Sequence, residues 1–311
     1  REGEVVWYTG LIMSQAVRPQ IEAFQKKYPG VIVRAAQRGS AEIVLAVTSE
    51  ARNKQPVADV LDGGGLMIPP LVKAGVLERF TPASAAPYPA TMKSTDGYWT
   101  ALTDNYLTVA INTDLVKDAD APKTYQDLLD PKWTGKMVWA DIASLSGPPG
   151  FIGAVLMSMG REAGIEYLRK LSEQKIVKIA GNQRQALDQV IAGQYSIGQM
   201  TLNHHSVISA ERGAPSRWLK IEPLVQNFNI VSLVKNAPHP NAAKLLIDFL
   251  ASEAGQAIFR DANYLPAHPN VDAKTPSLKP TAGGFKAVAI TPDMADEQLS
   301  EWVKIYAELF S

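Results

Sequence analysis

The sequence predicts an α/β protein in which strands and helices alternate along the chain. Short apolar runs alternate with longer segments that carry apolar residues at helical spacing. The alternation is interrupted around residues 98–115 and begins again at Met137. A chain of 311 residues is long enough for two domains, each with its own core. We therefore expect two lobes, each a mainly parallel sheet covered by helices on both faces.

The elements of the first lobe are placed by apolar spacing and by Gly and Pro breaks. Strands are expected at 4–8, 31–33 and 58–61, which are short apolar runs. Helices are expected through Val17, Ile21 and Phe24, from Arg38–Glu42 through Val47, and from Gly63–Gly65 through Leu71 and Val72.

A strong strand, Tyr106–Ile111, precedes the second series. Strands of this series are expected at 137–140, 176–179 and 195–200, and helices around 151–159, 165–173 and 186–191. Strands at 221–226 and 229–234 then lead back to the first lobe. The remaining elements are a short helix within 122–132, a long helix through Leu245–Leu250, a helical continuation at 254–259, a surface excursion at 272–284 and a terminal helix through Leu299, Trp302, Ile305 and Leu309.

Composition limits the classes of function. Lys and Arg together number 31, as do Asp and Glu, so bulk charge does not favour nucleic acid or an anionic membrane. Cysteine is absent, which removes disulfides, thiolate metal sites and Cys nucleophiles. No apolar stretch approaches the ~20 residues that cross a bilayer, so no membrane insertion is expected. The catalytic motifs GxSxG, HExxH, Walker loop and GxGxxG are also absent, and we expect no catalytic residues and no cofactor.

Polar residues follow the strand at 195–200. Asn203, His204 and His205 are expected at its carboxyl end, where open α/β sheets hold ligands. On a strand the two histidines would point to opposite faces, so we expect at least one to meet a ligand.

Two predicted helix starts carry small polar residues. Ser144, Ser146 and Gly147 precede a helix in the second lobe, where hydroxyl and free backbone N–H groups would suit an anion. Ser40 and Ala41 offer the same arrangement in the first lobe, with Ser40 as the N-cap. Plain capping is the alternative at both starts.

Two further features accompany these helix starts. Gly64 lies in a glycine run that lets the backbone approach a ligand closely; its alternative is a simple turn. Arg184 begins another helix, either as an anion partner or as a solvated first-turn residue.

Nine motifs follow one another along the chain: Val5–Gly10, Phe24–Gly30, Gln55–Gly64, Val76–Pro82, Tyr98–Leu102, Ile111–Thr113, Pro131–Lys136, Asp141 with Leu145–Gly147, and Pro238–Asn241. In this order they resemble the motifs of bacterial extracellular solute-binding proteins that serve ABC importers. The resemblance covers nearly the whole chain and is closest to the ferric-iron-binding branch, whose relatives also carry thiamine, phosphonates and sugar phosphates.

The resemblance implies two doubly wound lobes joined by two crossing hinge strands, with a small-molecule ligand clamped between the lobes by hinge closure. Lobe one would comprise 1–105 plus 225–311, and lobe two 106–224. Tyr8 and Thr9 at the first strand's end and Gln226 by the hinge then join the expected ligand-binding residues. The resemblance also implies export to the periplasm or extracellular space with the signal removed, as a start at Arg1 without Met would fit. The expected partner is a membrane ABC permease, and the default state is a monomer.

Three departures from the iron-binding pattern decide the expected ligand. Iron-binding members carry two adjacent tyrosines where His204 and His205 stand, and imidazole suits Fe(III) less well than phenolate. Asp104-Asn105 occupies the place of an arginine, and the loop Tyr8–Ile12 lacks a histidine. We therefore expect a small organic or phosphorylated anion and no bound metal. Ferric iron or another metal, with His204 and His205 as ligands, is the alternative; a hydrolase or transferase is the alternative from another class.

Overall fold

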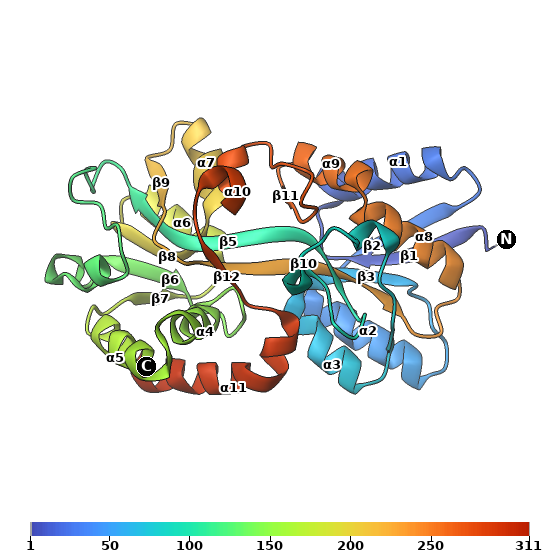
Figure 1. The fold of residues 1–311 in the computed structure, drawn as a ribbon, viewed down its shortest axis with the longest axis horizontal. Helices are drawn as coiled ribbons and strands as arrows, with labels where there is room; N and C mark the ends of the chain where they lie inside the picture. Colours follow the sequence, from blue (N-terminus) through green and yellow to red (C-terminus); the bar gives the residue numbers. More distant parts are fainter. Residues whose placement is uncertain (1, 311) are drawn as a thin grey trace. The chain divides into compact units, whose positions relative to one another are not determined.

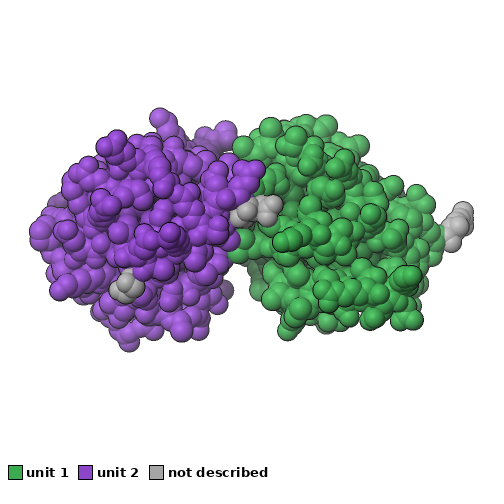
Figure 2. Space-filling model, turned by 90° about the horizontal axis from the view of Figure 1, so that it is seen from below, with its two compact units in different colours: residues 1–104, 228–276, 291–293 green, residues 105–227, 277–290, 294–311 purple. Residues whose placement is uncertain are grey.

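The computed structural model describes residues 2–310 and divides the chain into two compact units (Figure 2). Unit 1 comprises residues 1–104, 228–276 and 291–293, and unit 2 comprises residues 105–227, 277–290 and 294–311. Within the described residues no helix is both long and apolar enough to cross a membrane.

Unit 1 is built on three parallel strands, β1 (Glu4–Thr9), β2 (Ile32–Gln37) and β3 (Val60–Gly64), with β1 in the middle. In this unit α1 and α9 lie on one side of the sheet and α2 and α3 on the other (Figure 1). Burial on both faces explains why the central strands read as apolar runs in the sequence. The other elements of the unit are η1 (Met13–Val17), α1 (Arg18–Lys27), α2 (Ser40–Arg52), η2 (Gly65–Met67), α3 (Ile68–Lys73), β4 (Leu77–Glu78), η3 (Ala83–Ala85), η4 (Ala90–Met92), α8 (Pro240–Ala251), α9 (Glu253–Asp261) and β11 (Leu265–Pro266).

Unit 2 repeats this architecture around β6 (Met137–Ala140), β7 (Val177–Ile179) and β8 (Ile197–Leu202), which run parallel with β6 in the middle. Figure 1 shows α6 and α7 on one side of this sheet and α4, α5 and α11 on the other. The other elements are η5 (Gln126–Leu129), η6 (Pro131–Trp133), α4 (Pro148–Met159), α5 (Arg161–Ser172), α6 (Gln183–Ile191), α7 (Asn203–Glu211), β9 (Ser216–Leu219), η7 (Pro276–Leu278), α10 (Pro280–Gly283), β12 (Ala287–Ala289) and α11 (Pro292–Leu309). Of these, η7 and α11 begin with residues that are assigned to unit 1.

Two long strands, β5 (Thr100–Asn112) and β10 (Leu224–Val234), have residues in both units. They are the crossing strands that the resemblance implied, and the α/β fold class is confirmed. β10 is continuous, whereas the sequence predicted two strands with a break at its polar residues. The polar side chains are accommodated by hydrogen bonds: Gln226 donates to the Tyr106 hydroxyl at 3.1 Å and Asn229 to Thr103 Oγ1 at 3.1 Å.

The assignment of 1–105 and of all of 225–311 to the first lobe is wrong for Asn105 and for residues 225–227, 277–290 and 294–311, which belong to unit 2. The terminal helix α11 packs there: the Trp139 ring centroid lies 5.7 Å from that of Tyr306 and 4.9 Å from that of Phe310. An amphipathic pattern predicts that one face of a helix is buried, but it does not say which sheet covers that face.

The contact between α11 and α4 leads to a prediction about Gly153. A Cβ placed on Gly153 would lie 2.7 Å from the Trp302 ring, which is rigid and buried. Gly153→Ala is therefore expected to lower the free energy of unfolding by about 1–3 kcal/mol, despite the higher helix propensity of alanine. Urea denaturation measures this change. Gly30→Ala is the control, because no atom lies within 4 Å of its Cβ position. A G153A protein as stable as the wild type would contradict the packing.

Candidate functional site

In each unit the parallel strands end at one edge of the sheet, and a helical segment starts after each of them. In unit 2, β6 leads through residues 141–147 to α4, β7 leads to α6, and β8 leads directly to α7. Because the strands are parallel, these three helix starts lie at the same edge. The predicted residues Ser144, Ser146, Gly147, Asn203, His204 and His205 all belong to this edge.

The prediction that Asn203, His204 and His205 end a strand is wrong. The ladder between β8 and β5 ends at the pair Leu202 and Leu107, and α7 begins at Asn203. The two histidines therefore occupy the first helical turn, where neighbouring residues are about 100° apart rather than on opposite faces. Their ring centroids lie 4.5 Å apart with an interplanar angle of 71°.

Three polar atoms at the start of α7 are buried without a hydrogen-bond partner within residues 2–310: Asn203 Oδ1, His204 Nδ1 and His205 Nδ1. The Asn203 amide is oriented by its Nδ2, which donates to the Leu278 carbonyl oxygen at 2.9 Å. Its Oδ1 is therefore an acceptor that the fold leaves unpaired. A buried unpaired polar group costs about 1–3 kcal/mol, so three in consecutive residues indicate a place where a solute or ordered water completes the hydrogen bonds.

The start of α7 also lacks a cap. Its N-cap residue is Leu202, and no side chain in the described part of the chain bonds there. By contrast, α6 is capped by Asn182 and Gln185. Asn182 Oδ1 accepts from the Gln185 N–H at 3.1 Å, and Gln185 Oε1 accepts from the Asn182 N–H at 2.8 Å. The first-turn N–H groups of a helix have no intrahelical partner and carry partial positive charge. An uncapped start therefore attracts an anion or a hydrogen-bond acceptor.

Both imidazoles at this start are neutral. Burial, followed by the neighbouring His205, lowers the pKa of His204 to about 3. Burial, followed by the positive charge of Arg184, lowers the pKa of His205 to about 4, while Asp188 acts in the opposite direction. A neutral imidazole has one N–H donor and one lone pair. These two side chains can therefore bind a solute by hydrogen bonds at neutral pH without adding charge.

The start of α4 does not provide the free N–H groups that we expected. Gly147, not Ser146, is the N-cap, and the next two residues are prolines, which have no N–H. The Gly147 N–H donates to the Ser144 carbonyl at 3.1 Å, and the Ser146 N–H faces Ser144 Oγ at 3.3 Å. The two hydroxyl oxygens are 3.2 Å apart and bond each other. Pro148-Pro149 was the signal in the sequence that this helix start is a weak anion site.

In unit 1, the two candidates at the end of β1 are held by protein groups. The Tyr8 hydroxyl donates to Glu50 Oε1 at 2.7 Å, and the Arg38 guanidinium lies 4.7 Å from the centre of its ring. Burial, and then the bond to Glu50, raises the pKa of Tyr8 to about 12. Thr9 is fully buried, and its Oγ1 accepts from the Leu11 N–H at 3.1 Å. These contacts give both side chains a role in holding the scaffold.

Asp62 organises the end of β1 and was not predicted from the sequence. This fully buried carboxyl accepts from Trp7 Nε1 at 2.6 Å and from the Gly10 N–H at 3.2 Å. Burial raises its pKa to about 7, while bonds from Thr9, Gly10 and Trp7 act in the opposite direction. An acidic residue directly before the Gly63–Gly65 run was the available signal. It was overlooked because buried carboxylates are rare.

The candidates Ser40, Ala41 and Gly64 lie around the start of α2. The N-cap is Gly39 rather than Ser40, and the Glu42 carboxylate accepts from the Gly39 N–H at 3.1 Å. The Glu42 carboxylate, three residues after the N-cap, therefore performs the capping that the sequence predicted for Ser40. Ser40 Oγ instead accepts from the Gly64 N–H at 3.3 Å. Ala41 is exposed in the first turn.

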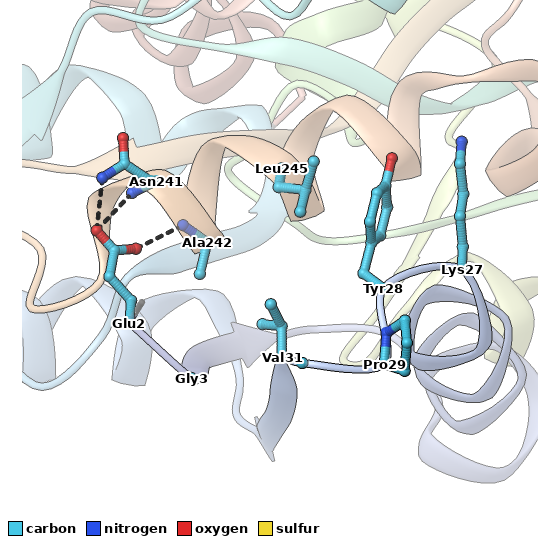
Figure 3. A pocket seen from close by; sticks show the side chains of 10 residues that line it. Glu2, Gly3, Lys27, Tyr28, Pro29, Val31, Asn241, Ala242 and Leu245 are labelled. Carbon is cyan, nitrogen blue, oxygen red and sulfur yellow. Dashed lines mark hydrogen bonds between the residues drawn. The ribbon is translucent and has the colours of Figure 1, made fainter.

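A cavity of about 830 Å³ lies elsewhere on unit 1, between the end of α1 and the start of α8 (Figure 3). At one end of it, Glu2 accepts from the Ala242 N–H at 2.7 Å and from Asn241 Nδ2 at 2.7 Å, which caps α8. Lys27 and Tyr28 lie at the other end (Figure 3). Among its described lining residues, no buried polar atom lacks a partner, so the cavity gives no sign of a built ligand site.

A metal site requires several ligand side chains that lie close together. No group of three or more His, Cys, Asp or Glu residues that could bind a metal ion occurs among the residues that the structure describes. His204 and His205 therefore have no third ligand of these types.

Comparison with known proteins identifies the class to which this fold and site belong. Residues 20–286 match the family described as bacterial extracellular solute-binding protein, and the chain belongs to this family. It is therefore an exported protein that binds a small solute, as the resemblance implied.

Individual relatives are more distant. The chain is 24% identical over 300 residues to a putative 2-aminoethylphosphonate-binding periplasmic protein of Salmonella typhimurium, covering 92% of this chain and 82% of the relative. It is similar to the structure of the Trichodesmium protein FutA in complex with iron and citrate, with a TM-score of 0.83, 18% identity and 99% of each chain covered. It is also similar to the periplasmic binding protein AfuA of Actinobacillus pleuropneumoniae with fructose-6-phosphate bound, with a TM-score of 0.78, 19% identity and coverage of 100% of this chain and 99% of that chain.

Proposed function

We propose that this protein is the substrate-binding component of an ABC importer, and that it holds a small organic or phosphorylated anion at the start of α7. The observation that carries the proposal is the trio of buried, unpaired atoms on Asn203, His204 and His205 at an uncapped helix start. A membrane permease is the partner that receives the solute. The protein acts as a binder rather than as a hydrolase or transferase.

The chemistry of this start favours an anion with hydrogen-bonding groups. Free N–H groups and the partial positive charge of the helix favour negative oxygen atoms. The imidazoles and the Asn203 carbonyl favour further polar groups on the same solute. A phosphonate or a sugar phosphate meets both requirements. Relatives whose names include 2-aminoethylphosphonate or whose structures hold fructose-6-phosphate support this class.

Iron is the second candidate, and the similarity to an iron- and citrate-bound structure is the observation that favours it. Fe(III) prefers hard oxygen ligands, whereas the unpaired groups at α7 are two imidazoles and one amide oxygen. The Tyr8 hydroxyl, the phenol nearest in type to an iron ligand among the predicted site residues, donates its hydrogen bond to Glu50. These contacts favour the organic anion over the metal.

A thermal-shift panel tests the proposal. Bound ligand raises the melting temperature by mass action, equivalent to about 2.7 kcal/mol at a concentration 100 times its Kd. The panel contains 2-aminoethylphosphonate, fructose 6-phosphate, citrate, ferric citrate and neutral fructose. We expect an increase with at least one metal-free organic anion and none with fructose. An increase in melting temperature with ferric citrate and no other compound would favour the iron function. Hydrolysis of fructose 6-phosphate, measured in a separate turnover assay, would favour an enzyme.

A further inference from the structure

The first turn of α6 donates side-chain hydrogen bonds to two other segments of unit 2. Gln183 Nε2 donates to the Ser146 carbonyl oxygen at 2.7 Å, directly before α4. Arg184 Nη1 donates to Ser209 Oγ at 2.9 Å, on α7. These bonds join three segments that are far apart in the sequence. The turn therefore fixes how the helix starts of unit 2 are arranged at the edge of the sheet.

Arg184 lies beside the histidine of the proposed site. Ser209 is four residues after His205 in α7, so both side chains are on the same face of the helix. A guanidinium bonded to Ser209 is therefore held along the face that carries His205. Asp188 also holds the guanidinium in place, because Arg184 Nε and Nη2 both lie 2.9 Å from Asp188 Oδ1.

In this arrangement Arg184 carries the positive charge, whereas His205 is a neutral hydrogen-bonding group. Arginine stays protonated at all physiological pH values, whereas a buried imidazole does not. The groups that face His205 are Arg184 and Asp188 from α6 and His204 from its own helix. The Arg184 charge lowers the pKa of His205, after burial, and Asp188 raises it. The side chain of Arg184 is 43% exposed, so its charge is also accessible from solvent.

We propose that Arg184 is a specificity-determining residue of this site. Its guanidinium, held by Ser209 and Asp188, supplies the positive charge that makes the start of α7 prefer an anionic solute to a neutral one. His205 then serves as a neutral hydrogen-bonding partner. This inference rests on the proposed function, since it assigns the charge preference of the same site.

Isothermal titration calorimetry with 2-aminoethylphosphonate, fructose 6-phosphate and fructose tests the proposal in the intact chain of residues 1–311. At pH 7.5 we expect Arg184→Met to weaken binding of the anion by about tenfold or more, with the preference for fructose 6-phosphate over fructose reduced equally. Arg184→Lys keeps the charge but loses the fork of donors, so we expect a smaller loss. Lys170→Met is the matched control, because Lys170 pairs with Glu166 four residues away on α5 in the same unit.

A second readout separates charge from simple folding effects. In ligand-free protein, NMR titration of the His205 ring should show its pKa moving upward in Arg184→Met and downward in Asp188→Asn. A structural role alone would not produce shifts of opposite sign. Arg184→Met that binds the anion as the wild type does, or that leaves the His205 titration unchanged, overturns this inference and leaves the proposed function standing. If neither anion binds the wild-type protein, the proposed function fails and this inference fails with it.

Discussion

Replacing His204 and His205 together by alanine is expected to weaken binding of the anionic solute by about 100-fold or more. A hydrogen bond to a charged group contributes about 1.5–3 kcal/mol, and the variant loses two such partners at the start of α7. Each single replacement should produce part of the loss. Titration calorimetry with the anion that gives the largest thermal shift measures the effect.

The matched control for this variant is Ser144→Ala combined with Ser146→Ala. Both hydroxyls belong to the same edge of unit 2, but they already bond each other at 3.2 Å. We expect their removal to change the affinity by less than about fivefold. A large loss in the serine variant, with normal binding by the histidine variant, would move the site from α7 to the start of α4.

The stability of the protein should depend on pH through His204, His205 and Asp62. The pKa values of both histidines are lowered in the folded state, to about 3 and about 4, so the unfolded state binds more protons between pH 4 and 6.5. Their contribution to stability therefore falls as pH decreases, by about 2 kcal/mol for each histidine at pH 5. The pKa of Asp62 is raised to about 7, so its folded state binds more protons and its contribution rises over the same range.

Urea denaturation at pH 7.5, 6 and 5 separates the two opposing contributions. The free energy of unfolding of wild type minus that of His204→Gln/His205→Gln should decrease on acidification, by an amount on the order of 4 kcal/mol. The same difference for Asp62→Asn should increase on acidification. If both differences stay constant with pH, the three groups are not buried as the structure shows.

The sequence predicted the fold class because the period of apolar residues reports the type of an element. It predicted the first two parallel strands of each unit in this way, whereas the crossing strands were implied by the family resemblance. It did not predict which sheet receives α11, since the residues that cover Trp302 and Tyr306 are distant in the chain. It also extended β8 toward His205, because the end of a strand is set by its neighbour and the ladder between β8 and β5 ends at Leu107.

Prediction of the candidate site was limited by a different cause. Residue type and position placed the two histidines and Asn203 after the correct strand. Tertiary contacts decide whether a polar atom is left without a hydrogen-bond partner. The sequence therefore predicted Tyr8 and Ser40 as ligand-binding residues, although Glu50 and Gly64 form hydrogen bonds with them. The role of Asp62 was hidden for the same reason.

The most direct test of the central claim uses the imidazole rings themselves, because the chain contains only 4 histidines. Long-range ¹H–¹⁵N spectra of the rings are recorded while 2-aminoethylphosphonate or fructose 6-phosphate is added. We predict saturable shifts of the ring nitrogens of His204 and His205, with His239 and His268 of unit 1 as internal references. Saturable binding of the anion that leaves both α7 rings unshifted would contradict the account.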